Sequence, residues 1–266
     1  MEKEAFDIII QGGQSNAVGY GLGDAEYKFI PNERILYLND TSAQFSGETG
    51  ISESDPQQPF VAMEARERTV KGISYGDFAL SFADSYIKNG LLAPDRKLLI
   101  IKTAVGGTAF ILKQWGLQNQ LHLRLIDMAR FALEQNPKNR IVGFLWHQGE
   151  SDAERSNPPE QYKQQLTDML KDVRKNFGEE IPYIAGDFIN DWKSKNLSKC
   201  EPIVEVIREV VQESGNAEFV ETTGLLSNDQ KIGNGDPIHF CRESLYEFGE
   251  RYFKAFQKCN EGKCCC

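Results

Sequence analysis

The chain has 266 residues, a 40% hydrophobic share and a net charge of -9, values that fit one large globular domain and exclude a disordered or collagen-like protein. The negative charge disfavours nucleic acid as the main partner, because binding a polyanion needs clustered Lys and Arg. The N-terminus has no basic segment ahead of a long apolar run, and no stretch of about 18 apolar residues occurs. We therefore expect a cytoplasmic protein that neither spans nor binds a membrane.

Short apolar, β-branched runs alternate with stretches of helical period along the chain. The runs that predict strands are residues 6–10, 35–38, 98–102, 141–146, 181–185 and 217–220. The stretches that predict helices are residues 75–89, 120–135, 159–177, 202–213 and 242–257. Nearly continuous apolar strands are typical of a parallel sheet that helices cover on both faces. The alternation predicts a doubly wound α/β fold.

Two segments depart from this pattern. Residues 39–71 are too long and polar for a tight connection and predict an irregular insertion, which is either functional or a disordered excursion. Residues 1–258 show no linker and form one predicted domain, whereas residues 259–266 hold four of the six cysteines. Adjacent cysteines match no ordinary zinc spacing, so we expect this tail to be disordered rather than a metal site.

A glycine-rich turn follows the first predicted strand and contains one serine, Ser15, in the stretch GQSNAVG. Ligands of open α/β sheets bind at the carboxyl ends of the strands, so a residue placed just after a strand is available for chemistry. Gly12, Gly13 and Gly19 let the backbone approach closely and aim its N–H groups at an anion. A serine at such a point also commonly caps a helix, and the stretch alone leaves both interpretations open.

A serine is a poor nucleophile unless a base takes its proton, and the chain has three histidines. His122 lies in a helical run and His147 ends a predicted strand, while His239 lies in the loop GNGDPIHF. His239 is the best candidate, because Asp236 three residues earlier can contact Nδ1 and leave Nε2 free for a serine. Asp236 also suits a helix cap, since a proline follows it.

Two further strand ends offer donors for the oxyanion of a tetrahedral intermediate. Gly106 and Gly107 follow the strand at residues 98–102, and a backbone N–H there can point at an anion. Gln148 follows the strand at residues 141–146 and offers a side-chain amide. Polar turns thus follow three predicted strands, and a fourth loop carries the aspartate and the histidine.

These stretches together resemble the SGNH hydrolase superfamily, and within it the branch of sialate O-acetylesterase-like proteins and family 6 acetylxylan esterases. The four blocks that carry the resemblance are GQSNAVG, VGGT, WHQGESD and DPIH, in that order. The resemblance implies a three-layer, flavodoxin-like α/β/α sandwich with about five parallel strands. Where the wider superfamily has an asparagine in the third block, this chain has Gln148, as the sialate-esterase-like branch does.

The resemblance also implies roles for individual residues. Ser15 would be the nucleophile, His239 the general base and then acid, and Asp236 its orienting partner. The Ser15 and Gly107 amides and the Gln148 side chain would bind the oxyanion. Gln14 and Glu150 would support the serine loop, although Glu150 is an alternative to Asp236 as the acidic partner.

The implied function is a serine esterase that removes O-acetyl groups from a small carbohydrate, of the acetylxylan or the sialate type, through an acetyl-enzyme. No metal or organic cofactor is needed for this chemistry. Aromatic side chains near the predicted site loops would either stack on a sugar or belong to the core. They are Tyr20, Phe110, Trp115, Trp146 and Trp192. The alternatives are a lipase or thioesterase with the same triad and a non-catalytic carbohydrate-binding protein.

Overall fold

A seven-stranded sheet forms the centre of the computed structural model, which describes residues 4–40 and 60–261. The strand order is β3-β2-β6-β1-β7-β8-β9, and all neighbours pair in parallel except β3, which is antiparallel to β2. The strands are β1 (Ala5–Gly13), β2 (Ile35–Asp40), β3 (Phe60–Glu64), β6 (Arg96–Lys102), β7 (Arg140–His147), β8 (Tyr183–Gly186) and β9 (Ala217–Val220). Since β1 lies between β6 and β7, its carboxyl end is where the chain switches from one half of the sheet to the other.

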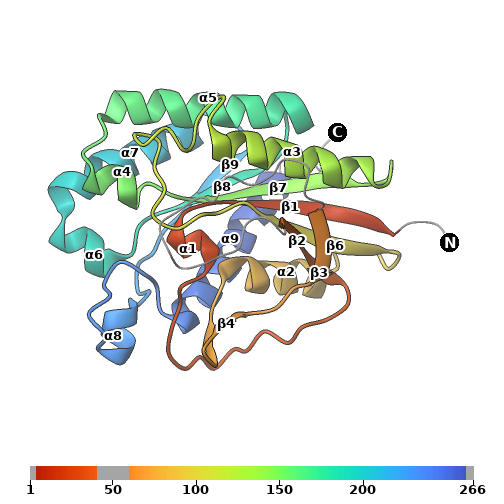
Figure 1. Ribbon diagram of the computed structural model, residues 1–266, viewed down its shortest axis with the longest axis horizontal. Helices are drawn as coiled ribbons and strands as arrows, with labels where there is room; N and C mark the ends of the chain where they lie inside the picture. Colours follow the sequence, from red (N-terminus) through yellow and green to blue (C-terminus); the bar gives the residue numbers. More distant parts are fainter. Residues whose placement is uncertain (1–3, 41–59, 262–266) are drawn as a thin grey trace.

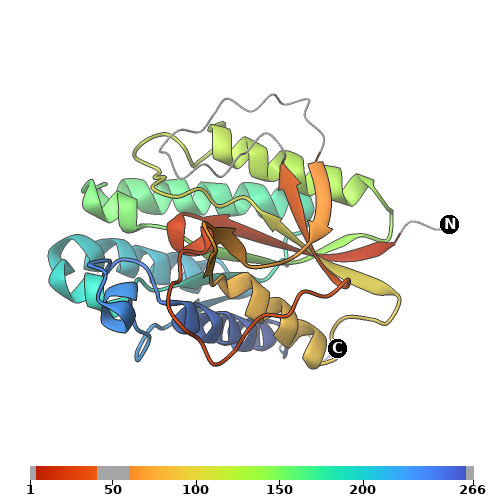
Figure 2. The same ribbon diagram turned by 60° about the horizontal axis from the view of Figure 1, so that its bottom comes forward.

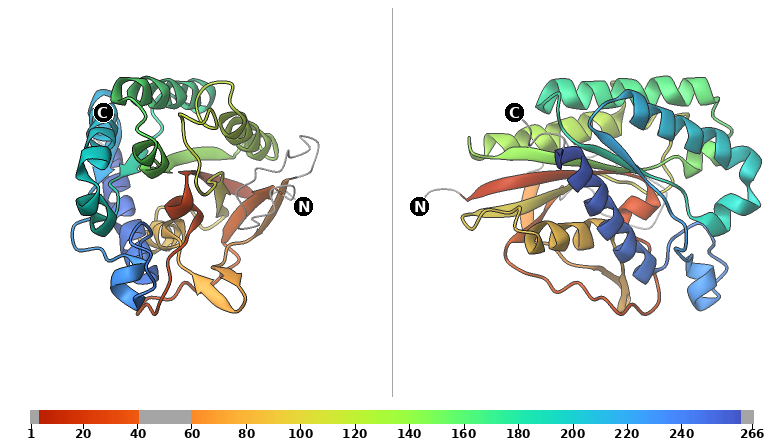
Figure 3. Two further views of the ribbon diagram at one scale, coloured as in Figure 1. Left: turned by 60° about the vertical axis from the view of Figure 1, so that its left-hand side comes forward. Right: turned by 180° about the vertical axis from the view of Figure 1, so that it is seen from behind.

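Helices cover both faces of the sheet, as Figures 1 and 2 show. One layer contains α3 (Gln120–Glu134), α5 (Pro159–Phe177) and α7 (Leu197–Glu213), and the other contains α2 (Phe78–Lys88) and α9 (Arg242–Glu261). Short helices lie at the carboxyl edge of the sheet (Figure 3), namely α1 (Ser15–Val18), α4 (Glu150–Glu154), α6 (Asn190–Lys195) and α8 (Asn228–Ile232). The predicted three-layer α/β/α fold is therefore confirmed. Within the described ranges no helix is long and apolar enough to cross a membrane.

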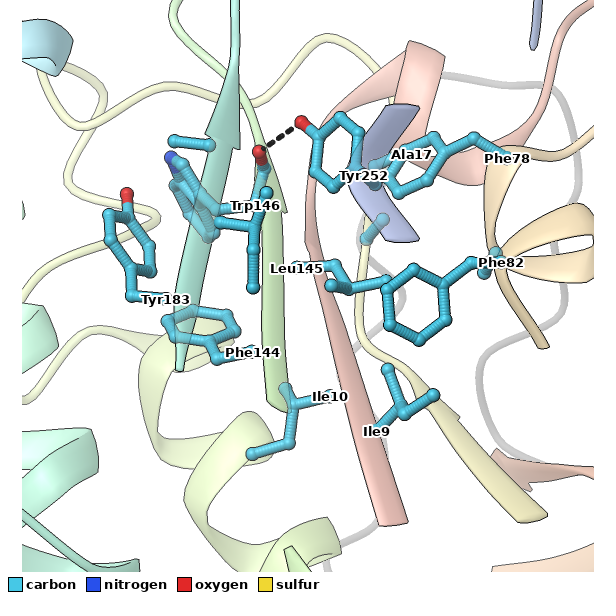
Figure 4. Close-up of a cluster of buried hydrophobic side chains, with 14 of the residues drawn as sticks. Ile9, Ile10, Ala17, Phe78, Phe82, Phe144, Leu145, Trp146, Tyr183 and Tyr252 are labelled. Atoms are coloured by element: carbon cyan, nitrogen blue, oxygen red, sulfur yellow. Dashed lines mark hydrogen bonds between the residues drawn. The ribbon is translucent and has the colours of Figure 1, made fainter. Parts of the chain in front are cut away.

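Side chains of the central strands alternate between the two faces and fill two apolar layers (Figure 4). Leu145 of β7 faces Phe82 of α2, whereas Phe144 and Trp146 point to the opposite face. The Tyr252 hydroxyl on α9 donates a hydrogen bond to the Trp146 carbonyl oxygen at 2.8 Å. Burying each such aromatic side chain stabilises the fold by about 1.5–3 kcal/mol, so the layers hold the strand ends firmly.

The insertion predicted to be irregular contains regular structure at its end. Residues 41–59 lie outside the described part, but β3 extends the sheet, and β4 (Arg68–Val70) pairs with β5 (Ile73–Tyr75) as a separate hairpin. The sheet therefore has seven strands rather than about five. These strands were not predicted because β4 and β5 have only three residues each and β3 pairs with β2 across residues 41–59.

The last helix extends further than expected. We expected the tail to begin at Cys259, but α9 continues to Glu261, and Cys259 is only 8% exposed. Its burial against the core extends the helix beyond the point where the apolar pattern fades. Residues 262–266, with the other tail cysteines, lie outside the described part of the chain.

Candidate active site

Ser15 lies at the carboxyl end of the central strand β1, where a sharp turn leads into α1. Gly13 has a φ of +131°, and a Cβ there would lie 1.9 Å from the His147 carbonyl oxygen, so only glycine fits. This close approach lets the Gln14 backbone N–H donate to the same oxygen at 3.0 Å. Ser15 is 7% exposed and lies at the switch point of the sheet, where ligands of such folds bind.

Asp236 and His239 form a pair in the loop between α8 and α9. Both carboxylate oxygens of Asp236 lie 2.9 Å from Nδ1 of His239. Burial by itself raises the pKa of the Asp236 carboxyl, but hydrogen bonds from His239 and from Asn228 outweigh it and leave the pKa below its usual value. An ionised Asp236 favours the tautomer with the proton on Nδ1, which leaves Nε2 free to accept a proton.

The completely buried side chain of Asn16 ties the serine loop to the histidine loop. Its Nδ2 donates to the Ile238 carbonyl oxygen at 3.1 Å, and its Oδ1 accepts from the Phe240 backbone N–H at 3.2 Å. The residue after Ser15 therefore binds the backbone on both sides of His239. This contact fixes the position of His239 relative to Ser15.

A second buried asparagine, Asn228, joins the same two loops. Its Nδ2 donates to the Tyr20 carbonyl oxygen at 3.0 Å and to Asp236 Oδ2 at 2.9 Å. Its Oδ1 accepts from the Leu22 backbone N–H at 2.8 Å, and its own N–H donates to the His239 carbonyl oxygen at 2.8 Å. Asn228 thus holds the acidic partner and the histidine against the chain that follows Ser15.

Ser15, Gly106, Tyr20 and His239 surround one point at the sheet edge. The Tyr20 ring stacks on the His239 ring with centroids 5.1 Å apart. A Cβ added to Gly106 would lie 3.4 Å from Tyr20 Oη and 3.8 Å from Ser15 Cβ. No hydrogen bond joins the Ser15 hydroxyl to the His239 ring within the described residues; such bonds are often long in free enzymes and tighten when substrate binds.

Two backbone N–H groups near this point are free for an anion. Within residues 4–40 and 60–261, the N–H groups of Ser15 and Gly107 donate to no protein acceptor. Gly107 has a φ of +72°, and nothing lies within 4 Å of where its Cβ would be. Asp152 holds the rest of this loop by accepting from the backbone N–H groups of Phe110 and Ile111, each at 3.0 Å.

Gln148 lies beneath this loop and is 1% exposed. Its Nε2 lies 2.7 Å from Asp152 Oδ2, and 3.3 Å from both the Thr108 carbonyl oxygen and Gln14 Oε1. With two hydrogens shared among three acceptors, Gln148 supports the loop here, and its role as an oxyanion donor stays a prediction. Gln14 joins the first and third blocks through this contact and through the Ser151 N–H, at 3.1 Å.

Glu150 is completely buried, and its side chain contacts Asn16 and His147 rather than His239. Its Oε1 accepts from Asn16 Nδ2 at 2.9 Å and lies 3.4 Å from Nδ1 of His147. The carboxylate beside His239 is therefore Asp236, and Glu150 supports the serine loop through Asn16. The remaining histidine, His122, lies in the first turn of α3 and bonds to Asp172 of α5.

Most of the aromatic side chains near the site belong to the core. Phe110, Trp115 and Trp146 are fully buried, and Trp192 is 7% exposed, which leaves the half-buried Tyr20 beside His239. Asn16 and Asn228 were not among the predicted site residues, although Asn16 directly follows Ser15 and so offered a signal. Within the described part of the chain, no group of three or more His, Cys, Asp or Glu side chains is placed to hold a metal ion.

This fold, with a serine, an imidazole and a carboxylate at the carboxyl edge of the sheet, is typical of SGNH hydrolases. A model of the family described as carbohydrate esterase, sialic acid-specific acetylesterase, matches residues 5–258. The chain belongs to this family.

Individual relatives are more distant. A stretch of 98 residues is 26% identical to the probable 9-O-acetyl-N-acetylneuraminic acid deacetylase of Escherichia coli (strain K12), covering 34% of this chain and 30% of that protein. The match thus spans about a third of this curated relative's length. The crystal structure of NanS is similar, with a TM-score of 0.75 at 19% identity over 97% of this chain and 98% of the other. A carbohydrate acetylesterase from Xanthomonas citri has a TM-score of 0.62 at 17% identity over 96% of this chain and 57% of the other. At these identities the two structures show a shared fold.

Proposed function

We propose that the protein removes O-acetyl groups from small acetylated carbohydrates, with Ser15 as nucleophile, His239 as general base and Asp236 as its partner. One observation carries the proposal: Asn16, the neighbour of Ser15, binds the backbone on both sides of a histidine that a carboxylate already orients. A serine, an imidazole and a carboxylate in this relation are the parts of a hydrolytic triad.

In the proposed reaction, Ser15 Oγ attacks the acetyl carbonyl carbon while His239 Nε2 takes the hydroxyl proton. The oxyanion receives hydrogen bonds from the N–H groups of Ser15 and Gly107, and the Gln148 amide is the expected third donor. Each such donor lowers the barrier by about 3–4 kcal/mol. The sugar oxygen leaves with the proton from His239. Water then attacks the acetyl-enzyme, His239 takes its proton, and Ser15 regains a proton as acetate leaves.

The family and the E. coli relative favour an O-acetylated sialic acid as substrate over acetylated xylan. Within the described residues the aromatic side chains Phe110, Trp115 and Trp146 beside the site loops are buried in the core, whereas Leu112 and Leu117 of the loop after β6 are exposed. The preference for a short acyl group therefore rests on the family, and the comparison of ester lengths below tests it.

Active-site labelling tests the proposal directly. A fluorophosphonate probe should label the wild type and not Ser15→Ala, and the wild type should hydrolyse p-nitrophenyl acetate far faster than the octanoate. His239→Ala should lose several orders of magnitude in turnover, because triad members act as a unit. A folded wild type that neither reacts with the probe nor releases acetate would reject the proposal, and preference for the octanoate would favour a lipase.

A further inference from the structure

The guanidinium group of Arg68, in β4, lies between two tyrosine rings beside the candidate site. Its Cζ is 4.5 Å from the centroid of the Tyr20 ring and 4.3 Å from that of Tyr75. Its Nη2 donates a long hydrogen bond of 3.3 Å to the Gly19 carbonyl oxygen. Since Tyr20 also stacks on His239, a single aromatic ring links the positive charge of Arg68 to the proposed catalytic base.

Arg68 forms no ion pair with any residue that the structure describes, and its Nε is buried without a hydrogen-bond partner. Neighbouring charges are paired: Glu67 binds Arg242 with oxygen–nitrogen distances of 2.7 and 2.8 Å, and Arg66 contacts Glu64. The chain has 39 acidic and 30 basic residues, so carboxylates are plentiful. Burying part of a charged group without a partner costs free energy, which a bound anion would recover.

The hairpin holds Arg68 in place relative to the serine loop. Arg68 and Tyr75 are directly opposite each other in the β4–β5 pair. The next glycine, Gly76, donates its N–H to the Gly21 carbonyl oxygen at 2.8 Å, which joins the hairpin to the chain just after Tyr20. Cation–π contact with two rings further restricts the guanidinium. Arg68 is therefore positioned in advance for a ligand at the site.

We infer that Arg68 binds an anionic group of the substrate, a carboxylate on an acidic acetylated sugar. A guanidinium presents paired N–H donors that match a carboxylate, and a neutral sugar such as xylose has no group of this charge. Arg68 then selects acetylated sialic acids over acetylated xylo-oligosaccharides. This inference rests on the proposed esterase function and adds to it the residue that distinguishes the two substrate types.

The test compares 9-O-acetyl-N-acetylneuraminic acid with its C1 methyl ester, in which a methyl group removes the charge of the carboxylate, and measures acetate release. The wild type should favour the free acid. Arg68→Gln should lower the ratio of kcat/KM for the acid to that for the methyl ester by about 10–100-fold, mainly through KM of the acid. Arg68→Lys, which keeps the charge and loses the paired donors, should give an intermediate ratio. The control Arg66→Gln removes a neighbouring exposed arginine and should leave the ratio within about twofold of the wild-type value.

An unchanged ratio in Arg68→Gln would overturn the inference, as would an equal loss on both substrates, which would show a structural role. The proposed function fails in a different way, by loss of acetate release from both substrates and absence of probe labelling. In that case, equilibrium binding of free N-acetylneuraminic acid still tests whether Arg68 binds an anion. Weaker binding to Arg68→Gln than to Arg66→Gln supports the anion site, and equal binding to the two variants rejects it.

Discussion

The amide oxygen of Asn16 accepts a hydrogen bond from the Phe240 backbone N–H at 3.2 Å, although the two residues are 224 positions apart in the sequence. The amide nitrogen of the same side chain donates to the Ile238 carbonyl oxygen, so His239 is held from both sides. Ser15 and His239 each adjoin this contact. The distance between Ser15 and His239, the proposed nucleophile and base, thus depends directly on one buried asparagine.

Replacing Asn16 with Asp should separate positioning from packing, because the two side chains have nearly the same shape. The aspartate keeps an acceptor for Phe240 but loses the donor to Ile238, and it places a second carboxylate beside Glu150. We expect kcat for p-nitrophenyl acetate to fall about a hundredfold or more, since misplacing a catalytic group by about 1 Å has effects of this size.

The matched control for Asn16→Asp is Asn260→Asp, at a partly buried asparagine of α9 far from the site. Its kcat should stay within about twofold of wild type. If Asn16→Asp behaves like this control while remaining folded by circular dichroism, Asn16 does not position His239.

Replacing Asp236 with Asn should abolish the control of the His239 tautomer while preserving the size of the side chain. An amide cannot stabilise the imidazolium that forms when His239 takes the serine proton, so kcat should fall by about 10³–10⁴. Stopped-flow or steady-state kinetics of p-nitrophenyl acetate hydrolysis measure this loss. A loss of less than about tenfold would mean that another carboxylate serves the histidine, and Glu150→Gln in the same background would then reveal it.

Asp7, at the amino end of β1, offers a test of stability away from the site. It is fully buried and accepts hydrogen bonds from Arg96 and Arg140, each at 2.7 Å, and from Tyr86 at 2.9 Å. Removing one partner of a buried charged cluster costs about 3–5 kcal/mol, so Asp7→Ala should lower the free energy of urea-induced unfolding by this order at pH 7. Activity per folded molecule should persist.

The same cluster sets a pH dependence. Burial alone raises the pKa of Asp7, but hydrogen bonds from Arg140, Tyr86 and Arg96 leave it below the usual 3.8 in the folded state. A lowered carboxyl pKa contributes stability above the unfolded value, and this contribution disappears as the pH falls through the folded value. The difference in unfolding free energy between wild type and Asp7→Asn should therefore shrink below about pH 4. A constant difference from pH 7 to pH 3 would contradict this account.

Two glycines with positive φ should respond very differently to alanine. Gly13→Ala places a Cβ 1.9 Å from a backbone oxygen, so the β1–β7 contact has to separate, and we expect a loss of more than about 3 kcal/mol or failure to fold. Gly72 has a φ of +79° with open space around it, so Gly72→Ala carries only the backbone strain of about 1–2 kcal/mol. Thermal unfolding of both variants measures the difference, and similar melting temperatures would contradict it.

Much of the fold could be predicted because buried parallel strands are continuous in their apolar character. The strands β1, β6 and β7 follow this rule closely, and the helix α5 has the apolar spacing expected of a helix with one buried face. The hairpin of β4 and β5 does not, since its strands have three residues each and its Tyr75 continued the helical pattern of α2. Three residues are too few to show an alternating pattern, and the two-residue turn at Lys71 and Gly72 was the local signal of this hairpin.

The candidate site could be predicted where its chemistry requires an uncommon combination of residues at a fixed spacing, as for Asp236 and His239. Asn228 was missed because its side chain acts through backbone groups of distant loops, which have no signature in the sequence. Asn16 was missed although its position directly after Ser15 offered a signal. For Gln148, the sequence gives the side chain but not the three acceptors that surround it.

The serine turn belongs to the first strand of the sheet, while the histidine loop immediately precedes its last helix, α9. A ribosome therefore produces the proposed nucleophile long before the proposed base, and the serine hydroxyl has no base to activate it until the histidine loop and α9 have docked. Onset of ester cleavage during translation would report the final docking event, and a chain interrupted anywhere between the two loops would remain inactive however well its early strands had folded.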